Sequence, residues 1–215
     1  MRAELTREIA DVARKHLASD GAAALSLRAV AREMGMASSA VYRYFPSRDD
    51  LLTTLIVDAY DALGEAAERA AASASGDLRS RWLAVCTAVR AWALAHPHEY
   101  ALVYGSPVPG YAAPEATIGP ASRVGLVLCG LVAEGVMAGE VGTRGSPVTP
   151  LAPGLAERLG LPESVAVRAV EAWITLFGLI SFELFGHTHN VVEDHERFFT
   201  TAAARLYDAA SGTSV

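Results

Sequence analysis

The side chains best suited to recognising another molecule lie between residues 37 and 44, where hydroxyls and phenols are closely spaced. The hydroxyls of Ser38 and Ser39 can donate to or accept from base edges and phosphates. The small side chain of Ala37 lets the backbone come close to a base edge. The phenols of Tyr42 and Tyr44 suit phosphate oxygens. This combination of residue types predicts contacts with a nucleic acid.

Three arginines flank these groups and could add charged contacts. Arg28 and Arg43 can reach a phosphate or a guanine edge, because a guanidinium donates two parallel hydrogen bonds. Arg48 falls in the first turn of a following helix, whose free backbone amides also favour an anion. Any one of these arginines alone is typical of a solvated surface charge, and the two tyrosines could be half-buried core residues. Their concentration in one short segment favours DNA binding.

Two short helices must position these groups. The first is predicted to begin after Ser26, a suitable N-cap, and to end at Gly35, which permits a tight turn. The second is predicted to have Ser38 as its N-cap and to stop at Pro46, which cannot continue a helix. Two helices joined in this way form a helix-turn-helix motif, here residues 26–45, whose second helix enters the major groove of DNA.

Helical periodicity continues through the rest of the chain, and no alternating apolar run is bounded by hairpin turns. The sequence therefore predicts an all-α protein with about nine helices. Besides the two of the motif, these are expected near residues 5–20, 47–73, 77–96, 97–105, 118–139, 162–187 and 193–210.

Composition excludes several classes of protein. Of the 215 residues, 52% are hydrophobic and the mean hydropathy is +0.25, which excludes a disordered chain. The longest strongly apolar stretches, 124–133 and 172–182, are about half the ~20 residues of a membrane span and are bracketed by charges. We therefore expect no membrane association and a cytoplasmic location. The two cysteines are interpreted as small buried hydrophobic residues.

Charge is unevenly distributed along the chain. The net charge is −6, but residues 1–54 hold eight basic and seven acidic residues. An acidic protein is poorly suited to non-specific binding of polyanions, whereas a nearly neutral N-terminal part can still carry one basic face.

The helix-turn-helix segment resembles the TetR family of transcriptional regulators. The resemblance rests on Leu27-Arg28-x-Val30-Ala31-x-x-Met34-Gly35-Met36 and on Val41-Tyr42-Arg43-Tyr44-Phe45-Pro46-Ser47-Arg48-x-x-Leu51-Leu52. It implies a three-helix DNA-binding domain over residues 3–63 and a helical domain over 77–211 that binds a ligand and dimerises. It also implies a homodimer on a palindromic operator, with repression as the expected activity and a small-molecule effector that causes release.

The resemblance also implies roles for individual residues. Tyr42, Tyr44 and Arg48 would contact phosphates, and the residues near base edges would be Arg28, Ala37, Ser38, Ser39 and Arg43. The family usually has His where Tyr44 stands and Lys where Arg48 stands. The C-terminal part resembles a subgroup marked by a Trp-His-Gly signature, of which Trp173 and Gly178 are present and Phe177 replaces the His.

The C-terminal helices offer candidates for a ligand pocket and a dimer interface. Helix 162–187 is apolar all round, which indicates burial on all sides and favours a four-helix bundle with a symmetry mate, although a monomeric core helix would show the same pattern. The candidate interface residues are Leu176, Leu179, Ile180, Glu183, Leu184, Phe198, Phe199, Ala202 and Leu206. The candidate pocket residues, which could instead be ordinary core residues, are Trp82, Trp92, Tyr100, Tyr104, Tyr111, Cys129, Met137, Trp173 and Phe177. Such a lining suits a largely apolar effector.

Other function classes have weaker support. A metal- or redox-responsive regulator on the same fold remains an alternative, although the histidine spacings do not complete a ligand set and no metal is expected. A small-molecule-modifying enzyme is a more distant alternative, because no nucleophile elbow, Walker loop, zinc-protease motif or dinucleotide fingerprint is present. We therefore predict no catalytic residues, no resident cofactor and no enzymatic activity.

Overall fold

The computed structural model describes residues 2–143 and 151–212, and within these ranges all regular structure is helical. Ten α-helices and two 3₁₀-helices occur there, and the described residues contain no strand. The all-α prediction is confirmed. The additional helix is a single turn, α8 (Leu155–Arg158), for which the sequence analysis predicts no helix.

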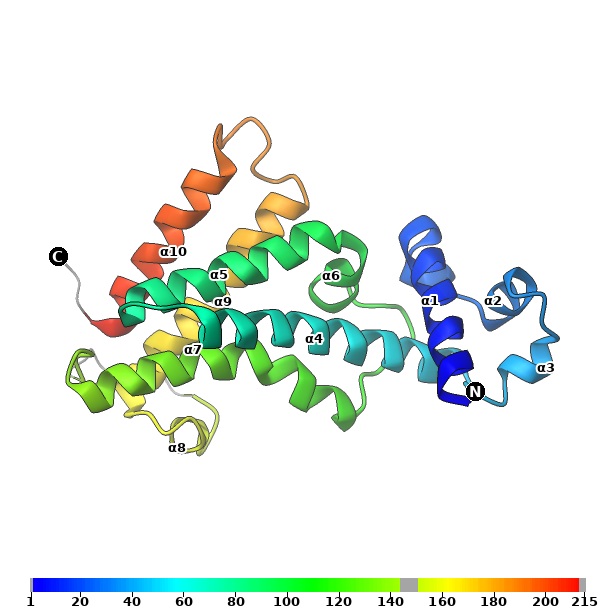
Figure 1. Cartoon of the computed structure of the whole chain (residues 1–215), viewed down its shortest axis with the longest axis horizontal. Coiled ribbons are helices and arrows are strands. Elements are labelled where there is room, and N and C mark those ends of the chain that lie inside the picture. Colours follow the sequence, from blue (N-terminus) through cyan, green and yellow to red (C-terminus); the bar gives the residue numbers. More distant parts are fainter. Residues whose placement is uncertain (1, 144–150, 213–215) are drawn as a thin grey trace. The chain divides into compact units, whose positions relative to one another are not determined.

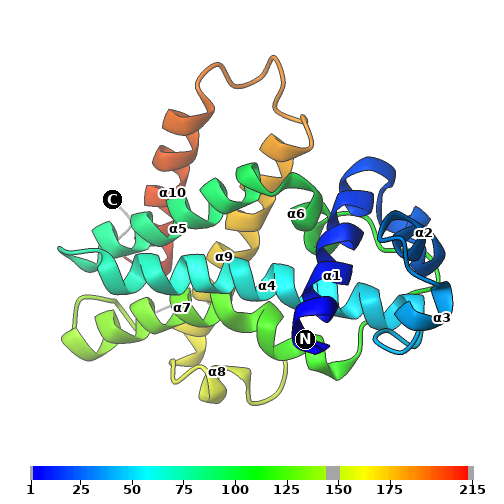
Figure 2. The ribbon, with the colours of Figure 1, turned by 45° about the vertical axis from the view of Figure 1, so that its right-hand side comes forward.

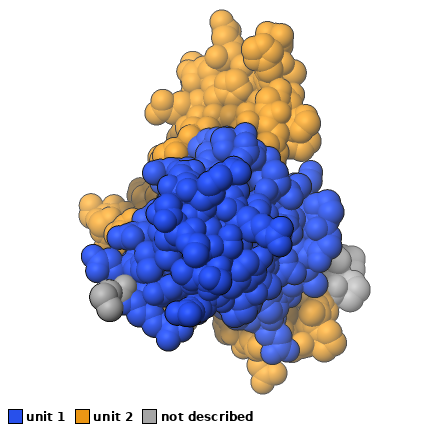
Figure 3. Space-filling view, turned by 90° about the vertical axis from the view of Figure 1, so that its right-hand side faces the viewer, with its two compact units in different colours: residues 1–62, 96–121 blue, residues 63–95, 122–215 orange. Residues whose placement is uncertain are grey.

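The chain divides into two compact units, coloured separately in Figure 3. Unit 1 comprises residues 1–62 and 96–121, and unit 2 comprises residues 63–95 and 122–215. The sequence assigned residues 96–121 to the C-terminal domain, whereas the structure groups them with the N-terminal helices. The reason is packing, because Leu102, Val103, Val108 and Tyr111 lie against the hydrophobic core of unit 1.

Unit 1 contains the N-terminal helices and the connected helix α6 (Figures 1 and 2). In chain order its elements are α1 (Arg2–Asp20), η1 (Ala22–Ala24), α2 (Leu27–Glu33), α3 (Ser38–Val41), the first part of α4 (Arg48–Ser73), α6 (Pro97–Tyr104) and η2 (Glu115–Thr117). Their shared core is built from fully buried aliphatic side chains, among them Ile9, Val30, Val41, Leu51 and Leu52.

Unit 2 contains the C-terminal helices. Its elements are the remainder of α4, α5 (Leu78–Ala95), most of α7 (Ile118–Ala138), α8, α9 (Glu163–Leu184) and α10 (His195–Ser211). Helices α9 and α10 are packed together and α5 contacts both of them (Figure 1). Trp82 is buried at the α5–α10 contact, where its indole Nε1 donates to the Ala203 carbonyl at 3.1 Å and its ring packs against Tyr207.

Two segments are apolar over a longer stretch than the sequence analysis anticipates. The segments Glu115–Ala138 and Glu163–Leu184 both have the length and composition of a membrane span, with a hydropathy of 1.6 over their most apolar window. Their charged residues are accommodated within unit 2, because Arg123 pairs with Glu68, Glu134 with Arg81, and Glu183 with Arg90. Counting only uninterrupted apolar runs therefore underestimates the length of the apolar segments, because a helix can include a few charged residues. Core helices of soluble proteins pass the same test.

The ion pair between Arg90 of α5 and Glu183 of α9 is the most enclosed of these. Arg90 donates from Nε and Nη2 to the two oxygens of Glu183 at 2.8 and 2.6 Å, and both side chains are about 15% exposed. The hydrogen bonds that Arg90 donates to Glu183 raise the pKa of Arg90. This two-pronged geometry joins the two helices through a pair that is largely shielded from water.

Replacing Glu183 by Gln is therefore expected to destabilise the protein by about 2 kcal/mol, because the Arg90 charge would remain poorly solvated and lose its counter-ion. The free energy of unfolding from urea denaturation measures the loss. Glu171→Gln on the exposed face of the same helix is the control and should change stability by less than about 0.5 kcal/mol. Equal stability of the two variants would contradict the assignment.

Candidate nucleic-acid interface

The turn between α2 and α3 fixes the geometry of the motif. Helix α2 ends at Met34, and Gly35 follows with φ 65°, a conformation that favours glycine. The amide of Met36 donates to the Ala31 carbonyl at 2.9 Å, which gives the Schellman arrangement of a helix C-terminus. The predicted role of Gly35 is confirmed by this geometry.

Helix α3 is only four residues long and depends on packing for its position. Val41 is fully buried and Phe45 nearly so, and both belong to the same core cluster as Leu27 and Val30 of α2. The N-cap is Ala37 rather than Ser38, which is the first helical residue. Ser47 caps the start of the next helix, since its Oγ accepts from the Asp50 amide at 3.1 Å and donates to the Asp50 carboxylate at 2.7 Å.

The surface of α3 and of the turn after it carries the polar groups singled out from the sequence. Ser39 and Arg43 are exposed and Tyr42 is 42% exposed. Residues three and four apart share a helix face, so these three side chains lie together on one side. Arg28 and Ala37 are also exposed, whereas Ser38 and Tyr44 are half-buried.

Tyr44 has a neighbour that the sequence did not suggest. The guanidinium carbon of Arg2 lies 5.9 Å from the centre of the Tyr44 ring, within the range of a cation–π contact. Arg2 is exposed at the start of α1, so this contact adds a cation beside the motif. The two residues are far apart in the chain, and no sequence pattern could have paired them.

Arg48 is placed differently from the expectation of a phosphate contact. Its Nε donates to the Leu25 carbonyl at 3.1 Å, and its Nη2 donates to the carbonyls of Ala22 and Ala23 at 2.8 and 3.3 Å. The remaining nitrogen lies 3.6 Å from Asp49. The donors of this guanidinium are therefore used to hold the segment that leads into α2, which makes Arg48 a positioning residue.

Acidic residues of the motif region also have partners within unit 1. Glu33 lies 2.7 Å from His16 Nε2 of α1, and Asp50 is held by Ser47. With the contact of Asp49 to Arg48, each of these three carboxylates has a polar partner within unit 1.

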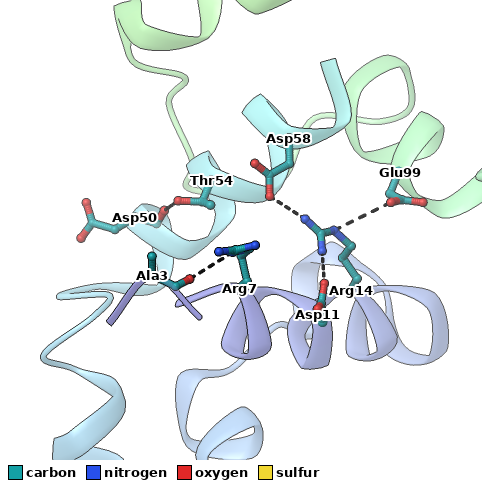
Figure 4. Close-up of polar contacts among 8 residues, drawn as sticks. All are labelled: Ala3, Arg7, Asp11, Arg14, Asp50, Thr54, Asp58 and Glu99. Atoms are coloured by element: carbon teal, nitrogen blue, oxygen red, sulfur yellow. Dashed lines mark hydrogen bonds and ion pairs between the residues drawn. The ribbon is translucent and has the colours of Figure 1, made fainter. Parts of the chain in front are cut away.

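Arg14 joins three helices of unit 1 (Figure 4). It donates from Nη2 to Asp58 of α4 at 2.5 Å, bonds Asp11 of its own helix, and lies 3.9 Å from Glu99 of α6. Two further hydrogen bonds connect α4 with the 96–121 segment, from Tyr60 to the Val103 carbonyl at 3.2 Å and between Thr53 and Tyr111 at 2.9 Å. Helix α6 and the residues after it are thus tied to the helices that support the motif.

The candidate pocket residues separate into two groups. Tyr100, Tyr104 and Tyr111 belong to unit 1, where Tyr104 packs against Tyr100 and edge-on to Tyr60. The group in unit 2 consists of Trp82, Trp92, Cys129, Met137, Trp173 and Phe177.

Within unit 2 the structure distinguishes core residues from surface residues. Trp82, Cys129 and Phe177 are buried, while Trp173 packs edge-on against Phe177 with ring centres 6.1 Å apart. Met137 is 81% exposed, which does not support its assignment to a pocket. Its position at the exposed end of α7 could not be distinguished from a core position by periodicity alone.

The candidate interface residues need a similar correction. Leu176, Ile180 and Phe199 are buried inside unit 2, and Glu183 is paired with Arg90, so these side chains are committed within one subunit. The remaining candidates are accessible to different degrees, since Phe198 is 50% exposed and Leu179, Leu184, Ala202 and Leu206 are half-buried. Helix α9 packs on one face and exposes another, and its apolar sequence hides this division.

Metal and thiol chemistry gain no support from the described part of the chain. Residues 2–143 and 151–212 contain no group of three or more His, Cys, Asp or Glu side chains arranged to hold a metal ion. Burial raises the pKa of the Cys86 thiol to about 12 and that of Cys129 to about 11. Since the thiolate is the reactive form, both cysteines are inert near neutral pH.

Comparisons with known proteins agree with the geometry of the motif. Residues 9–55 match the family model of bacterial regulatory proteins of the tetR family, and residues 82–206 match the tetracyclin repressor-like C-terminal domain. The second match alone covers more than half of the chain. The protein belongs to the TetR family of transcriptional regulators.

Relatives of this TetR-family protein are similar over most of their length. It is 40% identical over 193 residues to the HTH-type transcriptional regulator Rv1816 of Mycobacterium tuberculosis, covering 86% of this chain and 82% of that one. Among solved structures, the regulatory protein SCO4313 is 34% identical with a TM-score of 0.77, over 95% of this chain and 96% of the other. A Rhodococcus sp. RHA1 protein of unknown function is 26% identical with a TM-score of 0.76, over 96% and 95%. The protein is thus a DNA-binding regulator and not an enzyme.

The different placement of Arg43 and Arg48 predicts different consequences of removing them. Arg43→Ala should leave the free energy of unfolding within about 0.5 kcal/mol of the wild type. The slope of log affinity for DNA against log salt concentration should become less steep by about 1, which corresponds to the loss of one phosphate contact. Arg48→Ala should lower stability by about 1–2 kcal/mol, because the carbonyls of residues 22, 23 and 25 lose their donor.

Urea denaturation and binding of a selected DNA duplex at several salt concentrations measure the two effects. Arg69→Ala, which removes an exposed cation from unit 2, is the control for general charge. A lower salt dependence together with full stability in Arg48→Ala would restore the phosphate-contact assignment.

Proposed function

We propose that this TetR-family protein is a ligand-responsive repressor that acts in the cytoplasm and binds a palindromic operator as a homodimer. The observation that carries the proposal is the exposed face formed by Ser39, Tyr42 and Arg43, which is held on the core of unit 1 by Val41 and Phe45. A short helix with small and polar exposed residues fits the major groove.

The contacts to DNA divide into two groups in this proposal. Ser38, Ser39, Arg43 and Arg28, with the backbone at Ala37, read base edges or adjacent phosphates. Tyr42 and Tyr44 hold phosphates, with Arg2 as an additional cation beside Tyr44. The phosphate contacts set the register of the motif, and the base contacts supply sequence specificity.

Dimerisation through α9 and α10 is supported by an accessible apolar surface on these helices. Phe182 of α9 is 58% exposed and Phe198 of α10 is 50% exposed. An open groove of about 720 Å³ between the two helices is lined by Leu179, Ala202 and Leu206 with charged groups at its edge. A second copy would bury this face, and two-fold symmetry would place two recognition helices on successive half-sites.

Release by a small, largely apolar effector would operate by a shift between two conformations. Helix α4 contributes residues to both units, and within unit 1 it is bound to α1 by the Arg14–Asp58 pair and to the α6 segment by Tyr60 and Thr53. A ligand that favours one position of these helices would change the position of the motif through those contacts. Its effect on DNA affinity is limited to its differential affinity for the two states.

Selection of genomic DNA fragments on the purified protein tests the proposed operator. We expect an enriched palindrome whose affinity falls steeply with salt. Tyr42→Phe removes one phosphate hydroxyl, which should weaken binding about threefold to tenfold, whereas Tyr207→Phe in unit 2 is the matched control. No enrichment with protein that has been refolded to strip any bound ligand would contradict DNA recognition by this motif.

Replacing Phe198 by Glu tests the proposed dimer. A charge in the centre of the α9–α10 face should raise the dimer dissociation constant at least 100-fold and give a 22.6 kDa species in sedimentation equilibrium. Met137→Glu changes an exposed apolar residue of α7 and should leave the dimer intact. A monomeric wild type at micromolar concentration, or a dimer that tolerates Phe198→Glu, would exclude this interface.

A further inference from the structure

One buried polar atom of unit 2 has no protein partner among the described residues. The indole Nε1 of Trp173 on α9 is buried and finds no acceptor there. Trp82 shows the usual arrangement, since its Nε1 donates to a backbone carbonyl at 3.1 Å. Buried donors are almost always paired with a protein group, a water or a ligand. The Trp173 N–H is therefore an unsatisfied donor among the described residues, and a bound water or ligand would supply its acceptor.

Two contacts of this indole are with uncharged groups, a glycine of α7 and an aromatic ring of α9. Gly125 of α7 faces the indole edge, and a Cβ placed on it would lie 3.6 Å from Trp173 Nε1. The Phe177 ring packs edge-on against the indole on α9. Helix α7 thus approaches the donor without a side chain at the point of approach.

We propose that Trp173 is the hydrogen-bond donor to the effector, which is a largely apolar molecule carrying an uncharged acceptor oxygen such as a ketone, ester or amide. The inference rests on the proposed ligand response and adds the chemical class of the ligand. An apolar body suits the aromatic side chains, and the acceptor supplies the one polar contact that fixes its orientation.

An uncharged acceptor is favoured over a carboxylate. Burying an anion requires a paired cation, and the contacts of the indole with Gly125 and Phe177 supply none. The guanidinium of Arg90, which belongs to the most enclosed of the ion pairs described in unit 2, is already neutralised by Glu183. A neutral oxygen can accept from the indole without this electrostatic cost.

The structure provides two variants that separate the hydrogen bond from the available space. Trp173→Phe removes the N–H and keeps an aromatic ring. Gly125→Ala places a methyl group at ordinary contact distance from Nε1, so it fits the fold, favours the helix and occupies the space an acceptor would use. Gly130→Ala on the same helix is the matched control, because its new methyl would meet nothing within 4 Å.

Acetophenone and cumene serve as probes, because they have nearly the same shape and only acetophenone carries an acceptor oxygen. Isothermal titration calorimetry of the full-length protein should show that acetophenone binds the wild type about twofold to tenfold more tightly than cumene, the contribution of one hydrogen bond. Trp173→Phe should lose this preference or reverse it in favour of cumene, because the carbonyl oxygen would then be buried without a donor. Gly125→Ala should remain at least as resistant to thermal unfolding as the wild type and lose the preference, whereas Gly130→Ala should retain it.

Three results would overturn the proposal. These are equal binding of the two probes to the wild type, a preference for acetophenone that survives in Trp173→Phe, and no detectable binding of either probe at concentrations up to its solubility in water. DNA binding by the same preparations is measured in parallel. Intact operator binding with any of these results would reject the role of Trp173 and leave DNA recognition standing, whereas loss of operator binding by the wild type would reject the proposed function itself.

Discussion

The burial of Val41 and Phe45 against α2 is the constraint on which DNA recognition depends. Helix α3 has a single hydrogen-bonded turn, and an isolated helix of this length is not stable in water. Its conformation is therefore supplied by the core of unit 1, which holds the turn by its two apolar side chains. The polar residues between and beside them are left on the outside, because neighbouring positions on a helix point in different directions.

Polar contacts then set the helices of unit 1 in place around that core. Arg48 holds the carbonyls ahead of α2, Arg14 connects α1 with α4, and His16 contacts Glu33 of α2. Each of these is a long-range contact between charged or polar groups at the edge of the core, where geometry is restricted and water is only partly excluded. A DNA-reading surface that must be both exposed and precise needs this kind of support, since the groups that touch DNA cannot also pack inside.

In unit 2, ion pairs join long helices that are mostly apolar. Long apolar helices carry a few charges, and those charges are matched between helices, as in the pairs of Arg90 with Glu183 and Arg123 with Glu68. The hydrogen bond from Arg123 lowers the pKa of Glu68, because it stabilises the ionised carboxylate. Apolar side chains that find no place inside, such as Phe182 and Phe198, form the accessible face of α9 and α10. The Trp173 N–H is the exception to polar matching among the described residues.

The sequence by itself determined the helical fold, the helix-turn-helix motif and the family, because these depend on local periodicity, on Gly35 as a turn residue and on closely spaced recognition residues. It could not determine which apolar residues face the core, since α9 is apolar all round and its periodicity is hidden. Only the tertiary structure decided that Leu176 is buried while Phe182 is exposed, and that Met137 lies on the surface. It also decided that the Arg48 guanidinium donates to backbone carbonyls and that residues 96–121 pack with the N-terminal helices in unit 1. These outcomes depend on partners distant in the chain, and a residue type alone does not identify its partner.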